Sequence, residues 1–143
     1  MQRALPRADA LSSQMKVSVM AAKQAAERPR LYKIVGREAW DAARSSGRFL
    51  GSSDDARDGY IHLSAAHQVA GTLAKHFAGR RDLVLVEVDG EDLGTAVRWE
   101  PAQNGDLFPH LYAPLDMRAV VSEMPLELDD DGGHRLPQGL GRC

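Results

Sequence analysis

The sequence predicts an α+β domain made of mostly antiparallel β-sheets with two short helices. Segments with strand character outnumber segments with helical character, and both helical segments fall in the first half of the chain. A doubly wound parallel sheet would instead alternate strands and helices regularly. The length of 143 residues, 43% of them hydrophobic, suits one domain with its own core.

The first half of this domain begins with a strand and a short helix. Aromatic and β-branched residues in "LYKIV" (31–35) favour a strand. In "GREAWDAARSSG" the apolar residues recur three or four apart, so they share one face of a helix, and Gly47 is placed to end it. Residues 48–59 are small and acidic turn formers, which predicts a loop.

A second strand and the second helix follow this loop. "YIHLS" (60–64) has strand character, and Ser64 is a suitable N-cap for a helix over residues 65–78. The remaining segments predict strands. Residues 83–88 are nearly all branched and apolar, which indicates a central strand. "TAVRWEP" and "RAVVSEMPLEL" are also strand-like, and "LFPHLYAPL" is a proline-punctuated extended segment.

The chain divides into three parts by composition. Residues 1–29 are rich in Ala, Arg, Gln and Ser, and we expect a flexible N-terminal extension. Residues 30–128 should form the single α+β domain. Residues 129–143 are rich in Gly and Asp, and we expect a disordered C-terminal tail.

The composition also narrows the classes of partner. The net charge is −2 and no block of lysine and arginine supplies a basic face, so nucleic acid is disfavoured as a partner. No apolar run approaches the roughly 20 residues of a membrane span. The one cysteine, Cys143, has no partner for an internal disulfide, which fits a reducing cytoplasm. No Cys/His spacing indicates a metal site.

His62 is the first candidate for a functional residue. In the two-residue period of a strand, Tyr60, His62 and Ser64 lie on one face. An unpaired buried ring N–H costs about 1–3 kcal/mol, so this face is either wet or lines a pocket. Two interpretations stay open: His62 belongs to a ligand site, or it is a hydrogen-bonded structural histidine.

The segment "VRWEP" holds the second candidate, Glu100. Arg98 and Glu100 share a strand face, opposite Trp99. Pro101 biases the preceding backbone towards an extended conformation, which suits an acid that has to be held in place. The alternative is a common and weak salt bridge at a sheet edge.

The segment "LFPHLYAPL" holds the third candidate, His110. His110 and Tyr112 alternate onto one side of this stiff segment. The alternative is a packed loop in which Phe108 and Tyr112 are core anchors. A binding pocket is mostly apolar with a few convergent polar groups, and His62, Glu100 and His110 are the residues that we expect to converge.

Several motifs together resemble a known family. "LYKIVGREAW", "DGYIHLS", "HFAG", "LVLVEVD", "RWEP" and "FPHLYAPL" occur in the order found in a family of short bacterial and plant proteins known as domain of unknown function 952. The family's fold is similar to that of the ADP-ribosyltransferase and RNA 2′-phosphotransferase group. The resemblance therefore implies two split, mostly antiparallel sheets that grip NAD in a cleft.

The resemblance also implies positions for the site. Lys33 stands on the first strand, where the group usually has histidine or arginine, His62 and Ser64 stand on the second, and Glu100 or His110 on a later one. Taking the motifs and the resemblance together, we expect His62, Glu100 and His110 to be catalytic, and the ligand to be bound by Lys33, Tyr60, Ser64, Arg98, Trp99, Phe108 and Tyr112.

Two functions from different classes follow. In an ADP-ribosyltransferase-like enzyme, Tyr60 or Tyr112 would stack on the nicotinamide or the base. Lys33, Arg98 or His62 would contact phosphate or ribose, and Glu100 would stabilise the developing ribosyl cation. The alternative is a non-catalytic binding module that holds a small anionic metabolite or a partner protein in the same cleft. In either case we expect a small-molecule ligand, with NAD as the first candidate cofactor.

Overall fold

A computed structural model describes residues 29–138 and residue 140; the other residues, which include nearly all of the expected extension over 1–29, lie outside this description. The strands are β1 (Arg30–Gly36), β2 (Arg48–Phe49), β3 (Ile61–His62), β4 (Ser64–Ala65), β5 (Leu83–Asp89), β6 (Val97–Pro101), β7 (Leu107–Leu111), β8 (Leu115–Asp116) and β9 (Val120–Leu126). The α-helices are α2 (Arg37–Ser46), α3 (Ser53–Asp58), α4 (Val69–His76) and α5 (Gly90–Leu93). Single 3-10 turns cover Ala66–Gln68, Gly94–Ala96 and Met117–Ala119.

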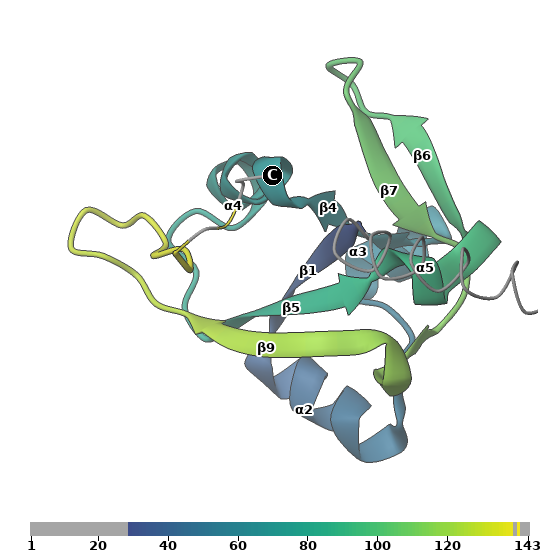
Figure 1. Ribbon diagram of the computed structural model, residues 1–143. Helices are drawn as coiled ribbons and strands as arrows, with labels where there is room; N and C mark the ends of the chain where they lie inside the picture. The colour runs from purple at the N-terminus through teal and green to yellow at the C-terminus, as the bar shows by residue number, and fades with distance from the viewer. Residues whose placement is uncertain (1–28, 139, 141–143) are drawn as a thin grey trace, which may run out of the picture.

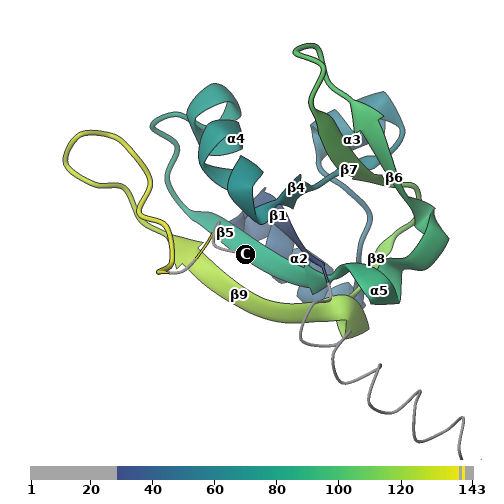
Figure 2. The ribbon, with the colours of Figure 1, turned by 45° about the horizontal axis from the view of Figure 1, so that its top comes forward.

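All strand pairs among the described residues are antiparallel, which confirms the predicted α+β class. A four-stranded sheet has the order β4-β1-β5-β9, a three-stranded sheet has the order β3-β7-β6, and β2 pairs with β8. Strand β5 lies between β1 and β9, as its apolar sequence predicts. In Figures 1 and 2 the hairpin of β6 and β7 projects away from the four-stranded sheet, and α3 lies beside it.

The four-stranded sheet has a core on each face, with α2 and α4 on opposite sides (Figure 1). Alternate residues of β5 separate the two cores: Val84, Val86 and Val88 pack with Trp40 of α2, and Leu83 and Leu85 pack with Val69 and Leu73 of α4. This alternation follows from the two-residue period of a strand. The ring centroids of Trp40 and Phe49 are 5.8 Å apart in the first core.

The strand predicted over residues 60–64 serves two sheets instead of one. His62 of β3 pairs with His110 of β7, whereas Ser64 of β4 pairs with Tyr32 of β1. Between them Leu63 is buried, and its backbone N–H donates to the carbonyl of Pro109. The chain therefore changes sheets at Leu63, and the prediction that Ser64 shares a strand face with His62 is wrong.

The helices differ from the sequence prediction in number and in their starts. The predicted loop over 48–59 contains α3, because Ser52 and Asp55 form a capping box and Gly59 ends the helix with φ of 88°. The short helix α5 follows β5 directly. Ser64 does not cap α4; its hydroxyl lies 3.2 Å from that of Thr72, and α4 starts after a 3-10 turn.

The described part of the predicted C-terminal tail contacts the domain. Leu128 and His134 form a β-bridge, and the guanidinium of Arg135 lies 2.8 Å from Asp129. Nε2 of His134 lies 2.8 Å from the carbonyl oxygen of Arg80, and Leu136 packs against the core under α4. These contacts differ from the disorder expected over 129–143. Within residues 29–138 and 140, no helix is long and apolar enough to cross a membrane.

Candidate functional site

Four of the predicted residues, Tyr60, His62, His110 and Tyr112, form a cluster of rings on the three-stranded sheet. Tyr60 stacks on His110 with ring centroids 4.0 Å apart and planes 23° apart. The centroid of Tyr60 is also 4.7 Å from that of His62 and 5.3 Å from that of Tyr112. The two imidazoles meet edge to face at 5.7 Å. This ring cluster stands where β3, β7 and the chain before β3 come together.

Glu100 joins the ring cluster from β6. Its Oε1 atom lies 2.8 Å from Nδ1 of His110 and accepts a hydrogen bond of 2.6 Å from the hydroxyl of Tyr112. These hydrogen bonds from Tyr112 and His110 hold the pKa of Glu100 below its ordinary value. The hydrogen bond between Tyr112 and Glu100 also raises the pKa of Tyr112. Among the described residues, no hydrogen bond reaches Oε2 of Glu100.

The strand register accounts for this arrangement. Arg98 pairs with His110, and Glu100 pairs with Phe108, so all four residues lie on one face of the β6–β7 hairpin. The guanidinium of Arg98 sits 4.9 Å from the ring centroid of Tyr112. Trp99 lies on the opposite face and is 47% exposed. The hairpin therefore brings Arg98 and Glu100 to the cluster, puts Phe108 on the same face, and turns Trp99 away from it.

His62 is held by two carboxylates that sequence reasoning missed. Its Nδ1 lies 2.6 Å from Oδ1 of Asp55, and its Nε2 lies 2.9 Å from Oδ2 of Asp58. Both aspartates belong to α3, the helix that the sequence prediction treated as a loop. Asp58 also binds Arg57 at 2.9 Å, and this hydrogen bond lowers the pKa of Asp58.

Asp55 is buried together with Lys33. The side chain of Asp55 is 2% exposed and that of Lys33 is 6% exposed, and Nζ of Lys33 lies 2.9 Å and 3.1 Å from the two carboxylate oxygens. Burial alone would raise the pKa of Asp55, but its bonds with His62, Lys33 and the backbone of Ser52 outweigh burial and hold the pKa well below the ordinary value. Burial lowers the pKa of Lys33, and Asp55 opposes that shift.

The expected role of Lys33 as a ligand contact does not fit this placement, since its ammonium group is turned inward and paired with Asp55. Ser64 also lies away from the ring cluster, in the other sheet. One local signal pointed to Asp55: "SSDD" has the spacing of a capping box, which predicts a helix start at this point. Its contact with Lys33, 22 residues away, has no local signal.

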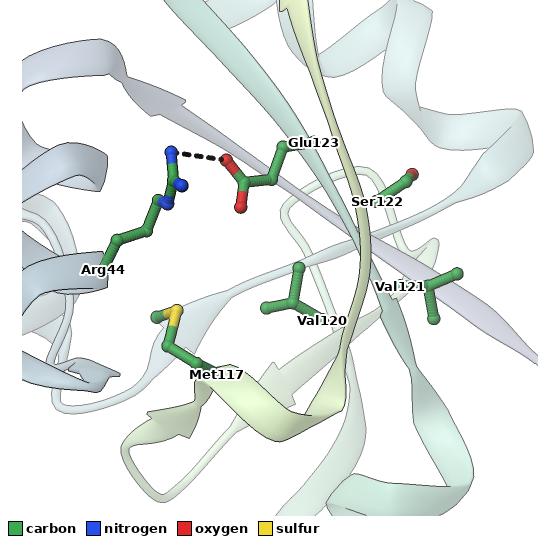
Figure 3. Close-up of a pocket in the computed structure, with 6 residues that line it drawn as sticks. All are labelled: Arg44, Met117, Val120, Val121, Ser122 and Glu123. Carbon is green, nitrogen blue, oxygen red and sulfur yellow. Dashed lines mark ion pairs between the residues drawn. The ribbon is translucent and has the colours of Figure 1, made fainter.

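The structure also contains an open hollow away from the ring cluster. Its volume is about 560 Å³, and it lies between α2 and β9 with Arg44, Met117, Val120, Val121, Ser122 and Glu123 as its lining (Figure 3). Arg44 and Glu123 form an ion pair of 3.5 Å across it. None of the candidate residues lines this hollow. Within the described part of the chain, no group of three or more His, Cys, Asp or Glu side chains is arranged to hold a metal ion.

Comparisons with known proteins confirm the family that the motifs resemble. A family model described as "Protein of unknown function (DUF952)" matches residues 34–123. The crystal structure of protein CC0527 from Caulobacter crescentus is similar with 48% sequence identity and a TM-score of 0.72, and the match covers 75% of this chain and 94% of that chain. The solution NMR structure of CC0527 matches with a TM-score of 0.69 and covers 92% of its chain. No curated protein matches the chain.

Proposed function

Because the chain belongs to the DUF952 family of proteins of unknown function, we propose a function from its site geometry: an ADP-ribosyltransferase-like enzyme that binds NAD or a related nucleotide at the ring cluster. In this proposal His62 and Glu100 are the reacting groups. Tyr60, Tyr112 and Arg98 hold the nucleotide, and His110 keeps Glu100 in place. Lys33 has an indirect role through Asp55.

The observation that carries the proposal is the opposite burial of two histidine–carboxylate pairs. In the Asp55–His62 pair the carboxylate is 2% exposed and the imidazole 37% exposed. In the Glu100–His110 pair the carboxylate is 35% exposed and the imidazole 9% exposed. The site thus presents one imidazole and one carboxylate to a ligand, each oriented by a more buried partner. Supported groups of this kind are what acid–base and electrostatic catalysis require.

The proposed reaction needs both groups. The bond between the nicotinamide nitrogen and the ribose breaks, and nicotinamide leaves with the bonding electrons. An anion beside the resulting ribosyl cation lowers the barrier, and Glu100 supplies that anion with Oε2 directed to no described partner. A hydroxyl or water then attacks the cation, and its proton is transferred to a base in the site. His62, once neutral, is placed to accept it.

Aromatic rings and one cation supply the binding. Tyr112 is 41% exposed, so part of its side chain can be reached by a nicotinamide or adenine ring. Arg98 lies over the same ring and is exposed, so its guanidinium can move from Tyr112 to a ligand phosphate.

Thermal melting with NAD, ADP-ribose and nicotinamide tests the binding step. A ligand at 100 times its dissociation constant stabilises the protein by about 2.7 kcal/mol, which gives a measurable rise in Tm. Glu100→Gln should keep the shift with NAD and slow nicotinamide release by about 10²–10³-fold, since one electrostatic contact to the transition state is removed. Arg118→Gln is the matched control, because Arg118 is 91% exposed and pairs only with Asp116 among the described residues.

The outcomes separate the enzyme from the binding module. If none of the three compounds raises Tm, the NAD proposal is wrong. If NAD raises Tm but no nicotinamide is released with water or added acceptors, the site is that of a binding module.

A further inference from the structure

Four charged or ionisable side chains form a chain from the core to the surface: Lys33, Asp55, His62 and Asp58. Consecutive members lie 2.9 Å, 2.6 Å and 2.9 Å apart. The first two are buried, and the last two are about one third exposed. These four side chains link β1 to β3 through α3, so three separate elements of the fold have to be in place for their contacts to form.

Asp55 fixes both the backbone and the ring of His62. Its Oδ1 atom accepts a 3.1 Å hydrogen bond from the backbone N–H of His62 and lies 2.6 Å from Nδ1 of the same residue. Its Oδ2 atom accepts from the backbone N–H of Ser52, and Lys33 neutralises the charge. A buried carboxylate with this many donors stays ionised and holds its orientation. It therefore holds His62 in one orientation with Nδ1 facing inward.

We infer that Asp55 is the positioning residue of His62: it keeps the proton on Nδ1, so that Nε2 is the nitrogen that exchanges a proton with a ligand. In the arrangement observed, both ring nitrogens face carboxylates, an arrangement that suits an imidazolium, in which both nitrogens are donors. When Nε2 gives up its proton, the ring becomes the neutral tautomer with Nδ1–H still bonded to Asp55. A ligand atom that bonds Nε2 then takes the place of Asp58.

Asp58 is suited to being displaced. It lies at the end of α3 and has a second partner in Arg57, whose guanidinium bonds both of its oxygens at 2.9 Å and 3.1 Å. Loss of the contact with His62 leaves its charge paired and partly solvated. Asp55 has no such freedom, because it is buried and bonded to three residues. The two carboxylates that contact the imidazole thus differ in role. Asp55 holds the ring in place, and Asp58 covers Nε2, the nitrogen that exchanges a proton with the ligand.

The other groups around the imidazole leave this assignment intact. Tyr60 precedes His62 and contacts its ring, and His110 of β7 meets the ring edge to face at 5.7 Å. His110 has its own carboxylate in Glu100, at 2.8 Å from Nδ1. Within the described part of the chain, neither residue forms a hydrogen bond with a nitrogen of His62, so Asp55 is the group that sets its tautomer.

Imidazole nitrogen NMR tests the inference on the full chain labelled with ¹⁵N-histidine. Two-bond ¹H–¹⁵N spectra recorded from acid to alkaline pH report which nitrogen of each histidine is protonated, and the signals that disappear in His62→Gln assign His62. The expected result is a neutral ring protonated at Nδ1 and unprotonated at Nε2. A neutral ring protonated at Nε2 overturns the inference, and this measurement needs no variant of Asp55 to fold.

Asp55→Asn and Asp54→Asn form a matched pair, since Asp54 is on the same helix and its side chain is 73% exposed. The Nδ1 proton of His62, held in a short bond to an anion, should give a slowly exchanging downfield signal in wild type and in Asp54→Asn. That signal should be lost in Asp55→Asn, because a neutral amide accepts more weakly. Its persistence there contradicts the role of Asp55.

The role of the Nε2 proton in catalysis rests on the proposed function, and experiment can distinguish failure of that function from failure of the positioning role of Asp55. If the enzyme proposal holds, Asp55→Asn should lower kcat for nicotinamide release by about 10²-fold or more with little change in KM, because the ring is misprotonated and binding groups are untouched. If wild type shows the expected tautomer but neither binds nor cleaves NAD, the positioning role stands and the proposed function fails. If NAD is cleaved and kcat is unchanged by Asp55→Asn, the positioning role is wrong.

Discussion

The two histidine–carboxylate pairs of the site use the same groups in opposite ways. Asp55 lies in the core with Lys33, and its imidazole partner reaches the surface. Glu100 lies at the surface with Tyr112, and its imidazole partner is buried beneath Tyr60. The pairs are neighbours, since His62 and His110 are cross-strand partners in β3 and β7.

The difference shows where each pair contributes to stability. A buried charge is costly unless its partner is present, so the Asp55–His62 pair and Lys33 depend on each other. An exposed charge is solvated whether or not its partner is present, so the Glu100–His110 pair contributes little to folding. We therefore expect the first pair to determine stability and pH response, and the second to affect function with little effect on stability.

The largest effect is expected for Asp55→Ala. This change leaves the ammonium of Lys33 buried without its carboxylate, and breaking a buried pair in this way costs about 3–5 kcal/mol. Urea denaturation measures the loss. Asp54→Ala, an exposed change on the same helix, should stay within about 0.5 kcal/mol of wild type.

The double variant Lys33→Met/Asp55→Ala sharpens this test. It removes both charges, so it should be more stable than Asp55→Ala alone. If the double variant is less stable than the single one, the unpaired ammonium is not the cause of the loss.

Acid should destabilise the protein through the same carboxylate. The pKa of Asp55 is lower in the folded state than in the unfolded state, where it is about 3.9. The folded state therefore binds fewer protons, and the stabilisation is complete above about pH 4 and is lost as the pH falls towards the folded pKa. Melting curves between about pH 2.5 and 6 should fall more steeply for wild type than for Asp55→Asn; parallel curves would contradict the assignment.

Replacing each histidine by phenylalanine compares the pairs directly. His62→Phe removes a donor from the buried Asp55, which costs about 1–3 kcal/mol. His110→Phe keeps a ring against Tyr60 and frees a carboxylate that water can solvate, so its cost should stay below about 1 kcal/mol. Equal losses of stability for the two variants in chemical denaturation would contradict the expected difference between the two pairs.

The smallest effect on stability is expected for Glu100→Gln. The amide oxygen can still accept the hydrogen bonds of His110 and Tyr112, and the lost charge is exposed. Its Tm should match that of Arg118→Gln, while nicotinamide release falls. A large drop in Tm would show that Glu100 supports the fold.

Much of the architecture was predictable because its signals are local. The apolar run of β5 predicted a central strand, the spacing of Trp40 and Ala43 predicted the buried face of α2, and Gly47 ends that helix with φ of 93°. The two-residue period also predicted that Arg98 shares a strand face with Glu100, and His110 with Tyr112. The cluster has this arrangement in the structure. These patterns repeat within a few residues, so the sequence alone contains them.

Tertiary structure alone decided the rest. The chain changes sheets at Leu63, which separates Ser64 from His62, because the backbone of Leu63 bonds Pro109 while β4 pairs with β1. Lys33 was expected to meet a ligand and instead neutralises Asp55, because the fold brings Asp55 of α3 to Lys33 of β1 and buries both charges together. Such pairings join residues distant in the chain, and no local period encodes them. The sequence by itself identified His62 as unusual; the fold supplied the buried carboxylate that holds it.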